Sequence, residues 1–453
     1  MTTGDLPGLA RLRPDDHFMI LSETDASPMH VGALLLFDAV PAGFAETIRR
    51  QVSERLPATP LLARLVEAPE GYDSDVWADV AACDLDYHLT RVSQPLDPVA
   101  LRAAVADLSM ERLDLARAPF RGFVFDALPG GAGAVYLKVH HAVADGIGFQ
   151  EILRRLSDAE PPPPPRPADA ALPDAETWRA AADARFAALA PEAAAHSAQR
   201  REALAALDAL KQDPASARAR TPVLKMSGPT SPQRSLATVS LPLARVKAVA
   251  AALGGTINDI FLAIAATAIR ETLLEIGDLP ETPVVVNSAR SYRRPEHGAF
   301  GNRIVALHPH VATHLADPVE RLRAIQASMA LERARTHLDE AMLGAPEKPN
   351  GARDRRAKFA ERTADGGRLL PGNVTLSNVP GPAEALSFAG LTLAANYPVP
   401  IIGSGRFLNI TSRRSGAMLD MGVMSDASRL PDARPIGARV AAALDLYEGL
   451  ALG

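Results

Sequence analysis

The chain has 453 residues, a length that suits two domains of ordinary size. Hydrophobic residues make up 47% of the chain and charged residues 22%, a balance typical of globular rather than disordered proteins. The net charge of −5 argues against nucleic-acid binding, and the single cysteine, Cys83, excludes an intramolecular disulfide.

The sequence predicts neither a targeting signal nor a membrane-spanning helix. Residues 1–5 lack the basic and apolar regions of a secretion signal. A membrane-spanning helix needs a run of about 18 apolar residues, which the chain does not contain. A lone cysteine also fits a reducing compartment, so we expect a cytoplasmic protein.

The first 158 residues alternate predicted strands and helices. Strands are expected at 29–37, 120–128 and 135–140, and helices at 42–55 and 101–108. In residues 135–140, apolar and mixed residues alternate with a period of two, which predicts a half-buried strand. Helical spacing begins after residue 146, so residues 140–146 connect a strand to a helix, a common place for functional side chains.

Residues 140–146 read His-His-Ala-Val-Ala-Asp-Gly, the most distinctive string of the chain. Successive side chains on a strand point to opposite faces, so His140 and His141 cannot serve the same site. A histidine near its ordinary pKa is well suited to remove a proton from an alcohol or an amine. Asp145 can fix the turn or pair with an arginine, and Gly146 permits a backbone conformation or a close approach that a Cβ forbids.

A purely structural role and a metal site both fit this string less well. Histidines are often structural and Asp-Gly pairs are often simple turns, but neither accounts for all seven residues. A metal site is disfavoured because adjacent strand histidines diverge and no His-x-x-x-His or cysteine cluster accompanies them.

Five consecutive prolines at 161–165 mark the clearest break in the chain. Beyond them, residues 174–212 predict one or two surface helices broken near Pro191, and residues 213–234 are irregular. We therefore divide the chain into an N-terminal subdomain at 1–158, a linker and helical crossover at 159–235, and a C-terminal subdomain at 236–453. The interleaved strands and helices predict an α/β fold, with a substrate site between the two halves.

The second half begins with an expected strand at 237–241, a helix at 243–253 and a longer helix at 257–274. Thr256 and Asp259 have the spacing of a capping box for the longer helix. Asn258, in its first turn, can offer an amide donor to an oxyanion or a carbonyl. Ser377 and Asn378, between an expected strand at 373–376 and a Pro-Gly-Pro turn, are weaker candidates for the same role.

A short buried strand is expected at 284–286, and Arg290 follows it. An arginine at the end of a buried strand needs a carboxylate partner. From the residue types we expect Arg290 to pair with Asp145.

The string His140-His141-x-x-x-Asp145-Gly146 resembles the signature of the acyl-CoA-dependent acyltransferases that share the chloramphenicol acetyltransferase-like fold. That superfamily includes condensation domains of peptide synthetases and the bacterial wax ester synthase/diacylglycerol acyltransferases. Further strings are similar to blocks of this last family, in the family's order; they are 28–32, 113–120, 258–259, 286–290, 301–302, 377–382, 397–399, 408–410, 426 and 431–432. The resemblance covers nearly the whole chain except about 159–234.

The sequence departs from the family pattern at a few positions. Leu115 stands where the family usually has arginine, and Phe120 follows Pro119 where Leu-Trp is usual. Residues 411–414 lack the usual Ser-Tyr. These departures concern substrate preference more than the type of reaction.

The resemblance implies two chloramphenicol acetyltransferase-like subdomains, each a mixed sheet flanked by helices, with the active site in a tunnel between them. It implies transfer of a fatty acyl group from acyl-CoA to a long-chain alcohol or a diacylglycerol, as in wax ester and triacylglycerol synthesis. His141 would be the general base and Asn258 the leading oxyanion donor, while Asp145 would organise the loop through Arg290. His140 would be structural or line the acyl side, and neither a metal nor a cofactor besides the acyl-CoA substrate is expected.

Two alternative functions remain open on the sequence. One is a diverged acyltransferase that acts on a non-lipid acceptor such as a specialised metabolite. The other is a non-catalytic relative that binds acyl lipids, although intact His141, Asp145 and Gly146 argue against it. The lipid products implied by the resemblance also suggest peripheral association with a membrane or with lipid inclusions; the sequence does not indicate an oligomeric state.

Overall fold

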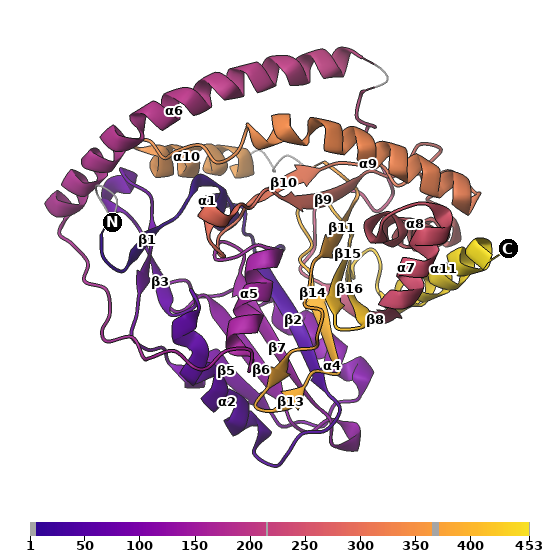
Figure 1. Cartoon of the computed structure of the whole chain (residues 1–453), viewed down its shortest axis with the longest axis horizontal. Helices are drawn as coiled ribbons and strands as arrows, with labels where there is room; N and C mark the ends of the chain where they lie inside the picture. Colours follow the sequence, from indigo (N-terminus) through magenta and orange to yellow (C-terminus); the bar gives the residue numbers. More distant parts are fainter. Residues whose placement is uncertain (1–5, 214–215, 365–370, 453) are drawn as a thin grey trace.

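The computed structural model describes residues 6–213, 216–364 and 371–452. Two large sheets, each covered by helices, lie beside one another, and a long helix arches along one side of the molecule (Figure 1). The layers are mixed α/β, as the sequence predicts. Among the described residues no single helix is long and apolar enough to cross a membrane, although α7 and α8 pass that test together as a pair bent by 98°.

The first sheet has five strands in the order β14-β2-β7-β6-β5. Their bounds are Ala395–Val399 for β14, His30–Phe37 for β2, Gly133–His140 for β7, Phe120–Phe125 for β6 and Leu89–Val92 for β5. The helices that accompany this half are α1 (Pro14–Leu21), α2 (Phe44–Arg55), α3 (Leu85–His88), α4 (Pro98–Met110) and α5 (Gly146–Leu156). The smaller strands are β1 (Leu9–Arg11), β3 (Ala63–Val66) and β4 (Val76–Asp79), which form a sheet of their own, and the hairpin β12 (Ser387–Phe388) with β13 (Leu391–Thr392).

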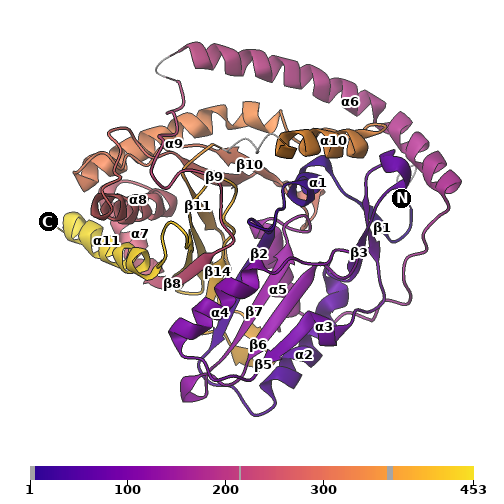
Figure 2. The same ribbon diagram turned by 180° about the vertical axis from the view of Figure 1, so that it is seen from behind.

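Strand β7 is buried along its whole length, whereas its sequence pattern predicted a half-buried strand. Helices cover both of its faces: Leu137 packs with residues of α2 and α5, and Tyr136 packs with residues of α4. The views from the two sides show these helices on opposite faces of the sheet (Figures 1 and 2). The polar Lys138 is tolerated there because its Nζ donates to the carbonyl oxygens of Leu108 and Glu111.

The second sheet has six strands in the order β10-β9-β11-β15-β16-β8. Their bounds are Ile304–Leu307 for β10, Val286–Ser291 for β9, Val374–Val379 for β11, Leu408–Ser415 for β15, Met418–Asp426 for β16 and Arg234–Pro242 for β8. The helices of this half are α7 (Leu243–Leu253), α8 (Ile257–Glu275), α9 (Pro318–Glu340), α10 (Gly351–Ala364) and α11 (Arg434–Leu452).

One face of this second sheet forms the largest apolar core. Alternate residues, such as Val286, Leu376 and Ile410, pack against the nearly all-apolar α8. Because side chains alternate along a strand, the intervening residues face the other way, toward the first sheet. That opposite face is the one that lines the functional site.

Two links between the halves differ from the expectations, the first in where a strand pairs and the second in the continuity of the expected crossover helix. Strand β14, from the last third of the chain, pairs antiparallel with β2 and so belongs to the first sheet. The division of the chain at 158 and 235 stays a prediction, but the sheets do not follow it at this strand. Helix α6 (Ala175–Gln212) runs unbroken through Pro191, because an internal proline removes one hydrogen bond and can bend a helix without ending it; it lies along α9 and α10 in both views (Figures 1 and 2).

Candidate active site

The loop between β7 and α5 carries the distinctive string found in the sequence. Strand β7 ends at His140 and α5 begins at Gly146. Asp145 caps the helix, since its Oδ1 accepts a hydrogen bond from the backbone N–H of Gly148 at 2.9 Å. The loop is therefore fixed at both ends by regular structure.

The two histidines lie on opposite sides of the strand end, as the alternation predicts. His140 is fully buried beside Glu23 and His30, and its Nδ1 accepts a hydrogen bond from the backbone N–H of Ala142 at 3.1 Å. Burial lowers the pKa of His140 to about 3, so this histidine is neutral at physiological pH. Its environment makes it a structural residue.

His141 faces the other way and is oriented by Asn302. The His141 Nδ1 and the Asn302 Oδ1 lie 2.9 Å apart. The Asn302 Nδ2 donates to the backbone oxygen of His141 at 2.7 Å and to Oδ1 of Asp16 at 2.9 Å. Both of these partners accept only, so the amide oxygen must face the histidine, and the shared hydrogen must sit on Nδ1. The Nε2 of His141 is therefore left with a free lone pair, as a general base requires.

The environment also keeps His141 neutral. Burial lowers its pKa, and this effect outweighs the opposing influence of the Asp145 carboxylate and the Asn302 hydrogen bond. Burial raises the pKa of the Asp16 carboxyl, and the positive charge of Arg13 opposes this effect by lowering it. Asp16 and Asn302 thus hold the imidazole from behind without placing a proton on its free nitrogen.

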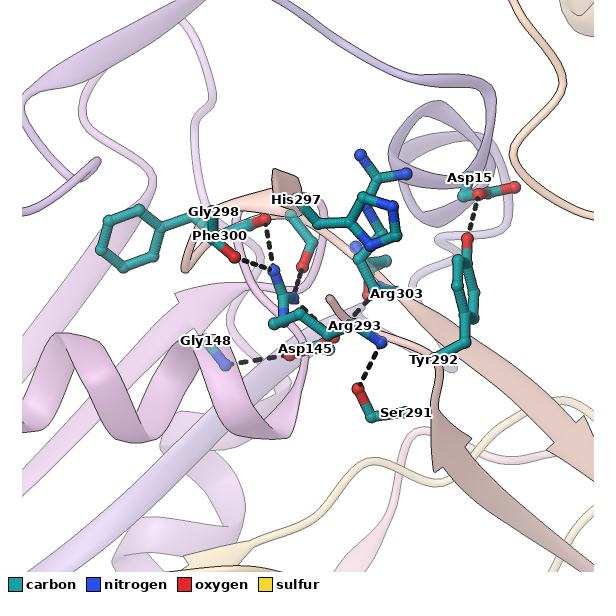
Figure 3. A network of polar contacts seen from close by, with 12 residues as sticks. Asp15, Asp145, Gly148, Ser291, Tyr292, Arg293, His297, Gly298, Phe300 and Arg303 are labelled. Carbon is teal, nitrogen blue, oxygen red and sulfur yellow. Dashed lines mark hydrogen bonds and ion pairs between the residues drawn. The ribbon is translucent and has the colours of Figure 1, made fainter. Parts of the chain in front are cut away.

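Asp145 is paired with Arg293, not with Arg290. The Arg293 Nη2 lies 2.8 Å from the Asp145 Oδ2, and the backbone N–H of Arg303 donates to the same oxygen at 3.0 Å (Figure 3). The expected pairing with Arg290 is wrong because β9 extends to Ser291, and its strand geometry leaves Arg290 exposed. Arg293 comes after the strand ends, in a loop that turns back toward α5.

Two glycines, one at the start of α5 and one between β9 and β10, shape the surroundings of His141 through different constraints. A Cβ on Gly146 would lie 3.0 Å from Cγ2 of Val379 in β11, so this glycine allows the two halves to approach closely. Gly301 has a φ of +74°, a left-handed conformation that suits glycine, and it directs Asn302 toward His141. The close approach, one of the two expected roles, is the one that the structure assigns to Gly146.

His141 opens onto a cavity of about 530 Å³ between the two sheets. On the second sheet, the residues that face away from α8 and toward the first sheet line this cavity. They form rows that run across the strands. The row nearest His141 contains Ile304, Ser291, Val379 and Arg413; the next contains Ala306, Ala289, Ser377 and Thr411; the farthest contains His308, Asn287, Thr375 and Asn409. Residues of α1, β2 and β14 close the other side, including Phe18, Met19, Val31 and Pro398. The cavity is thus a mostly uncharged passage between the halves, with the base at one end.

Comparisons with known proteins identify the family. Residues 12–261 match the wax ester synthase/diacylglycerol acyltransferase catalytic domain, and residues 300–448 match the C-terminal domain of the same family. The chain belongs to the wax ester synthase/diacylglycerol acyltransferase family. A Mycobacterium tuberculosis protein named as a diacylglycerol O-acyltransferase is 30% identical over 98% of this chain and 91% of its own length. A Mycobacterium bovis protein of the same name is 30% identical over 97% of this chain and 99% of its own length.

Solved structures show the same fold. The wax ester synthase/diacylglycerol acyltransferase from Marinobacter aquaeolei VT8 matches with a TM-score of 0.68 and 22% identity, over 98% of this chain and 100% of that one. The first condensation domain of the calcium-dependent antibiotic synthetase matches with a TM-score of 0.62 and 17% identity, over 99% of this chain and 97% of that one. The expected arrangement of two chloramphenicol acetyltransferase-like subdomains is confirmed.

The remaining predicted site residues fall into two groups. Ser377 and Asn378 line the cavity, and both lie within β11 rather than after a strand as expected. Asn258 is not among the described residues that line it, so its expected role as oxyanion donor is not supported. The reason is that the α8 N-terminus lies beside α9, on the far side of the second sheet, where Thr256 and Asp259 form the expected capping box.

The sequence reasoning missed the two residues that orient His141. Gly301-Asn302 matched a family block, but no role was assigned to Asn302. Nothing in the sequence distinguished Asp16 as a functional residue, because an aspartate in the first turn of a helix is usually solvated and interacts only with the helix N-terminus. Within residues 6–213, 216–364 and 371–452 no cluster of three His, Cys, Asp or Glu residues could hold a metal ion.

Proposed function

We propose that this chain transfers a fatty acyl group from acyl-CoA to the hydroxyl of a diacylglycerol or a long-chain alcohol. The observation that carries the proposal is a chain of hydrogen bonds from Asp16 through Asn302 to His141. This chain orients the imidazole so that its unprotonated Nε2 faces a cavity between the sheets. Membership of the family supports the reaction type, and the names of the mycobacterial relatives favour diacylglycerol as acceptor. Wax ester synthesis from a long-chain alcohol is the second acceptor to test.

The transfer needs one base and no covalent intermediate. The Nε2 of His141 takes the proton of the acceptor hydroxyl while that oxygen bonds to the thioester carbonyl carbon. The tetrahedral intermediate then breaks its carbon–sulfur bond, and the proton passes from His141 to the departing thiolate. A base in this position contributes roughly 10²–10⁴ in rate.

The carbonyl oxygen gains negative charge during this step and needs hydrogen-bond donors. Ser377 and Asn378 are the candidates, in place of Asn258, because both line the cavity that contains His141. Ser377 is the stronger candidate because it lies in a cavity-facing row, whereas Asn378 shares the strand face of the core residue Leu376, and its Oδ1 accepts a hydrogen bond from the hydroxyl of Ser412 at 3.0 Å. Losing one such donor costs roughly 3–4 kcal/mol of transition-state stabilisation.

Asp145 acts on the loop rather than on the proton. Its two oxygens are occupied by the backbone of Gly148 and Arg303 and by the side chain of Arg293. A carboxylate engaged in this way fixes the loop that carries His141.

The proposal is tested by measuring CoA release and lipid products with acyl-CoA donors and both acceptors. We expect His141→Ala to abolish transfer with the fold intact, and His140→Gln to cost less. Wild-type activity should be retained at neutral pH and above and fall in acid, as His141 becomes protonated. Substantial transfer by His141→Ala would refute the assignment, while thiol release at background level with every acceptor would favour a non-catalytic lipid-binding protein.

The cellular location stays a prediction. We propose a cytoplasmic enzyme that meets its acceptor at the surface of a membrane or a lipid inclusion, because both acceptors partition into lipid. Co-flotation of the protein with diacylglycerol-containing vesicles, compared with vesicles that lack it, tests this point.

A further inference from the structure

Two arginines are buried in the wall of the substrate cavity. Arg406 is 6% exposed and Arg413 is 3% exposed. Neither forms an ion pair with a carboxylate in the part of the chain that the structure describes. Burying an unpaired cation is costly, so each needs compensation from the protein or from a ligand.

Arg413 is compensated by the protein. Its Nη1 donates to Oδ1 of Asn396 at 3.1 Å, and its guanidinium lies 5.3 Å from the centre of the Phe149 ring. The nearby carboxylate of Asp420 also attracts it. Its buried Nε also has no hydrogen-bond partner among the described residues, but the amide, the ring and the carboxylate together offset its charge at the end of the cavity nearest His141.

Arg406 has far less support. Its Nη2 donates to the carbonyl oxygen of Pro371 at 3.0 Å, and its buried Nε has no hydrogen-bond partner among the described residues. Burial lowers the pKa of Arg406 to about 10, which still leaves the guanidinium charged at neutral pH. A guanidinium offers five N–H donors in a planar fork that matches phosphate, and among the described residues only the bond to Pro371 uses this capacity.

The position of Arg406 relates it to the chemistry. It precedes β15, beside the row of Asn287, Thr375 and Asn409, whereas His141 lies at the opposite row. The two rows are four residues apart along β11 and β15, which is about 13 Å at the rise of a strand. The row between them carries small side chains, so an extended chain can pass from one end to the other.

We propose that Arg406 binds a phosphate group carried by a substrate of the acyl transfer, at the end of the cavity opposite His141. This inference rests on the proposed function. Phosphate can come from two sources: the pyrophosphate of the CoA donor, or a phosphate on a lysophospholipid acceptor. The spacing favours the donor, because the pantetheine arm contains two amide units and reaches roughly as far as four or five extended residues.

The experiment compares donors that share a thioester but differ in phosphate. Dodecanoyl-CoA and S-dodecanoyl pantetheine are each paired with dodecanol and with lysophosphatidate. Wild type is compared with Arg406→Gln and Arg406→Lys, and Arg414→Gln is the matched control, since Arg414 lies on β15, the strand that follows Arg406, but does not line the cavity. All variants are checked for a cooperative thermal transition.

We expect Arg406→Gln to lower kcat/KM for dodecanoyl-CoA roughly 10- to 100-fold, mainly through KM, as loss of a charge-assisted hydrogen bond predicts. Turnover of S-dodecanoyl pantetheine with dodecanol should be unchanged, and Arg406→Lys should recover part of the loss. Arg414→Gln should resemble wild type with both donors.

Each pattern of loss decides the proposal. A loss confined to the CoA donor assigns the phosphate to CoA, and a loss confined to lysophosphatidate assigns it to the acceptor. Equal losses with every pair, or none, overturn the proposal. Calorimetric titration with free CoA and with lysophosphatidate measures binding independently of turnover. If wild type transfers no acyl group at all, the proposed function fails. Weaker binding of either phosphate compound by Arg406→Gln than by wild type would still support the phosphate site. Identical affinities of wild type and Arg406→Gln for both compounds count against it.

Discussion

Replacement of Asn302 with alanine tests how His141 is held. The Asn302 amide makes three hydrogen bonds, to the Nδ1 of His141, to its backbone oxygen and to Asp16, at 2.9, 2.7 and 2.9 Å. Without the amide oxygen, nothing described in the structure fixes the proton on Nδ1, and a fraction of the imidazole adopts the tautomer with a protonated Nε2. The base is then lost without any change in the cavity wall.

The size of the effect follows from the lost bond. A buried donor left without its acceptor costs roughly 1–3 kcal/mol, which corresponds to a fall in kcat of roughly 5- to 150-fold. KM should stay within about twofold of wild type, because Asn302 lies behind His141 and not on the cavity wall. A purely structural role does not predict this split between kcat and KM.

The assay measures CoA thiol release over a range of acceptor concentrations, with thermal unfolding recorded in parallel. Asn373→Ala is the matched control. Asn373 is also a buried amide, hydrogen-bonded to Pro222 and Val285, and it does not line the cavity. Both variants should lose stability, but only Asn302→Ala should lose kcat. If the two variants lose kcat equally, or if Asn302→Ala keeps the wild-type kcat, the proposed tautomer control is refuted.

Three further predictions concern the loop and the pH dependence of stability. Arg293→Gln should lower activity at least tenfold, because it removes the partner of a buried carboxylate, whereas Arg290→Gln should stay within about twofold. Gly146→Ala should be inactive or unstable through overpacking against Val379, and Val379→Ala should restore part of the activity. Burial lowers the pKa of His17 to about 4, so the unfolded state binds the proton first and stability falls from pH 6.5 to about 4, by roughly 1.4 kcal/mol per pH unit.

Each of these has a clear contrary result. Equal losses for the two arginine variants would show that the ion pair with Asp145 does not matter to the loop. Failure of the double variant at positions 146 and 379 to exceed the single glycine variant would show that crowding is not the cause. Denaturant titrations of His17→Gln should show a shallower pH slope than wild type, and identical slopes would contradict the assignment.

Local features of the chain were predictable because they depend on neighbouring residues. The separation of His140 from His141 follows from strand alternation, and the Thr256–Asp259 capping box follows from spacing. The family was likewise apparent from short strings in the right order. These are statements about residues within a few positions of one another.

Long-range partners were not predictable from the same information. Three arginines lie between residues 290 and 294, and only the point at which β9 ends decides which one reaches Asp145. Asn258 has a chemically suitable amide, but the buried helix that carries it lies behind the second sheet. The link from Asp16 to His141 joins residues 125 positions apart through a third element.

Strand β14 has a consequence for biosynthesis. It completes the edge of β2, yet about 360 residues separate the two strands in the chain. At a synthesis rate of roughly 5–20 residues per second, the edge of β2 stays uncovered on the ribosome for roughly 20–70 s. An open strand edge is a template for pairing with other chains, so the nascent first half needs protection until its last strand emerges.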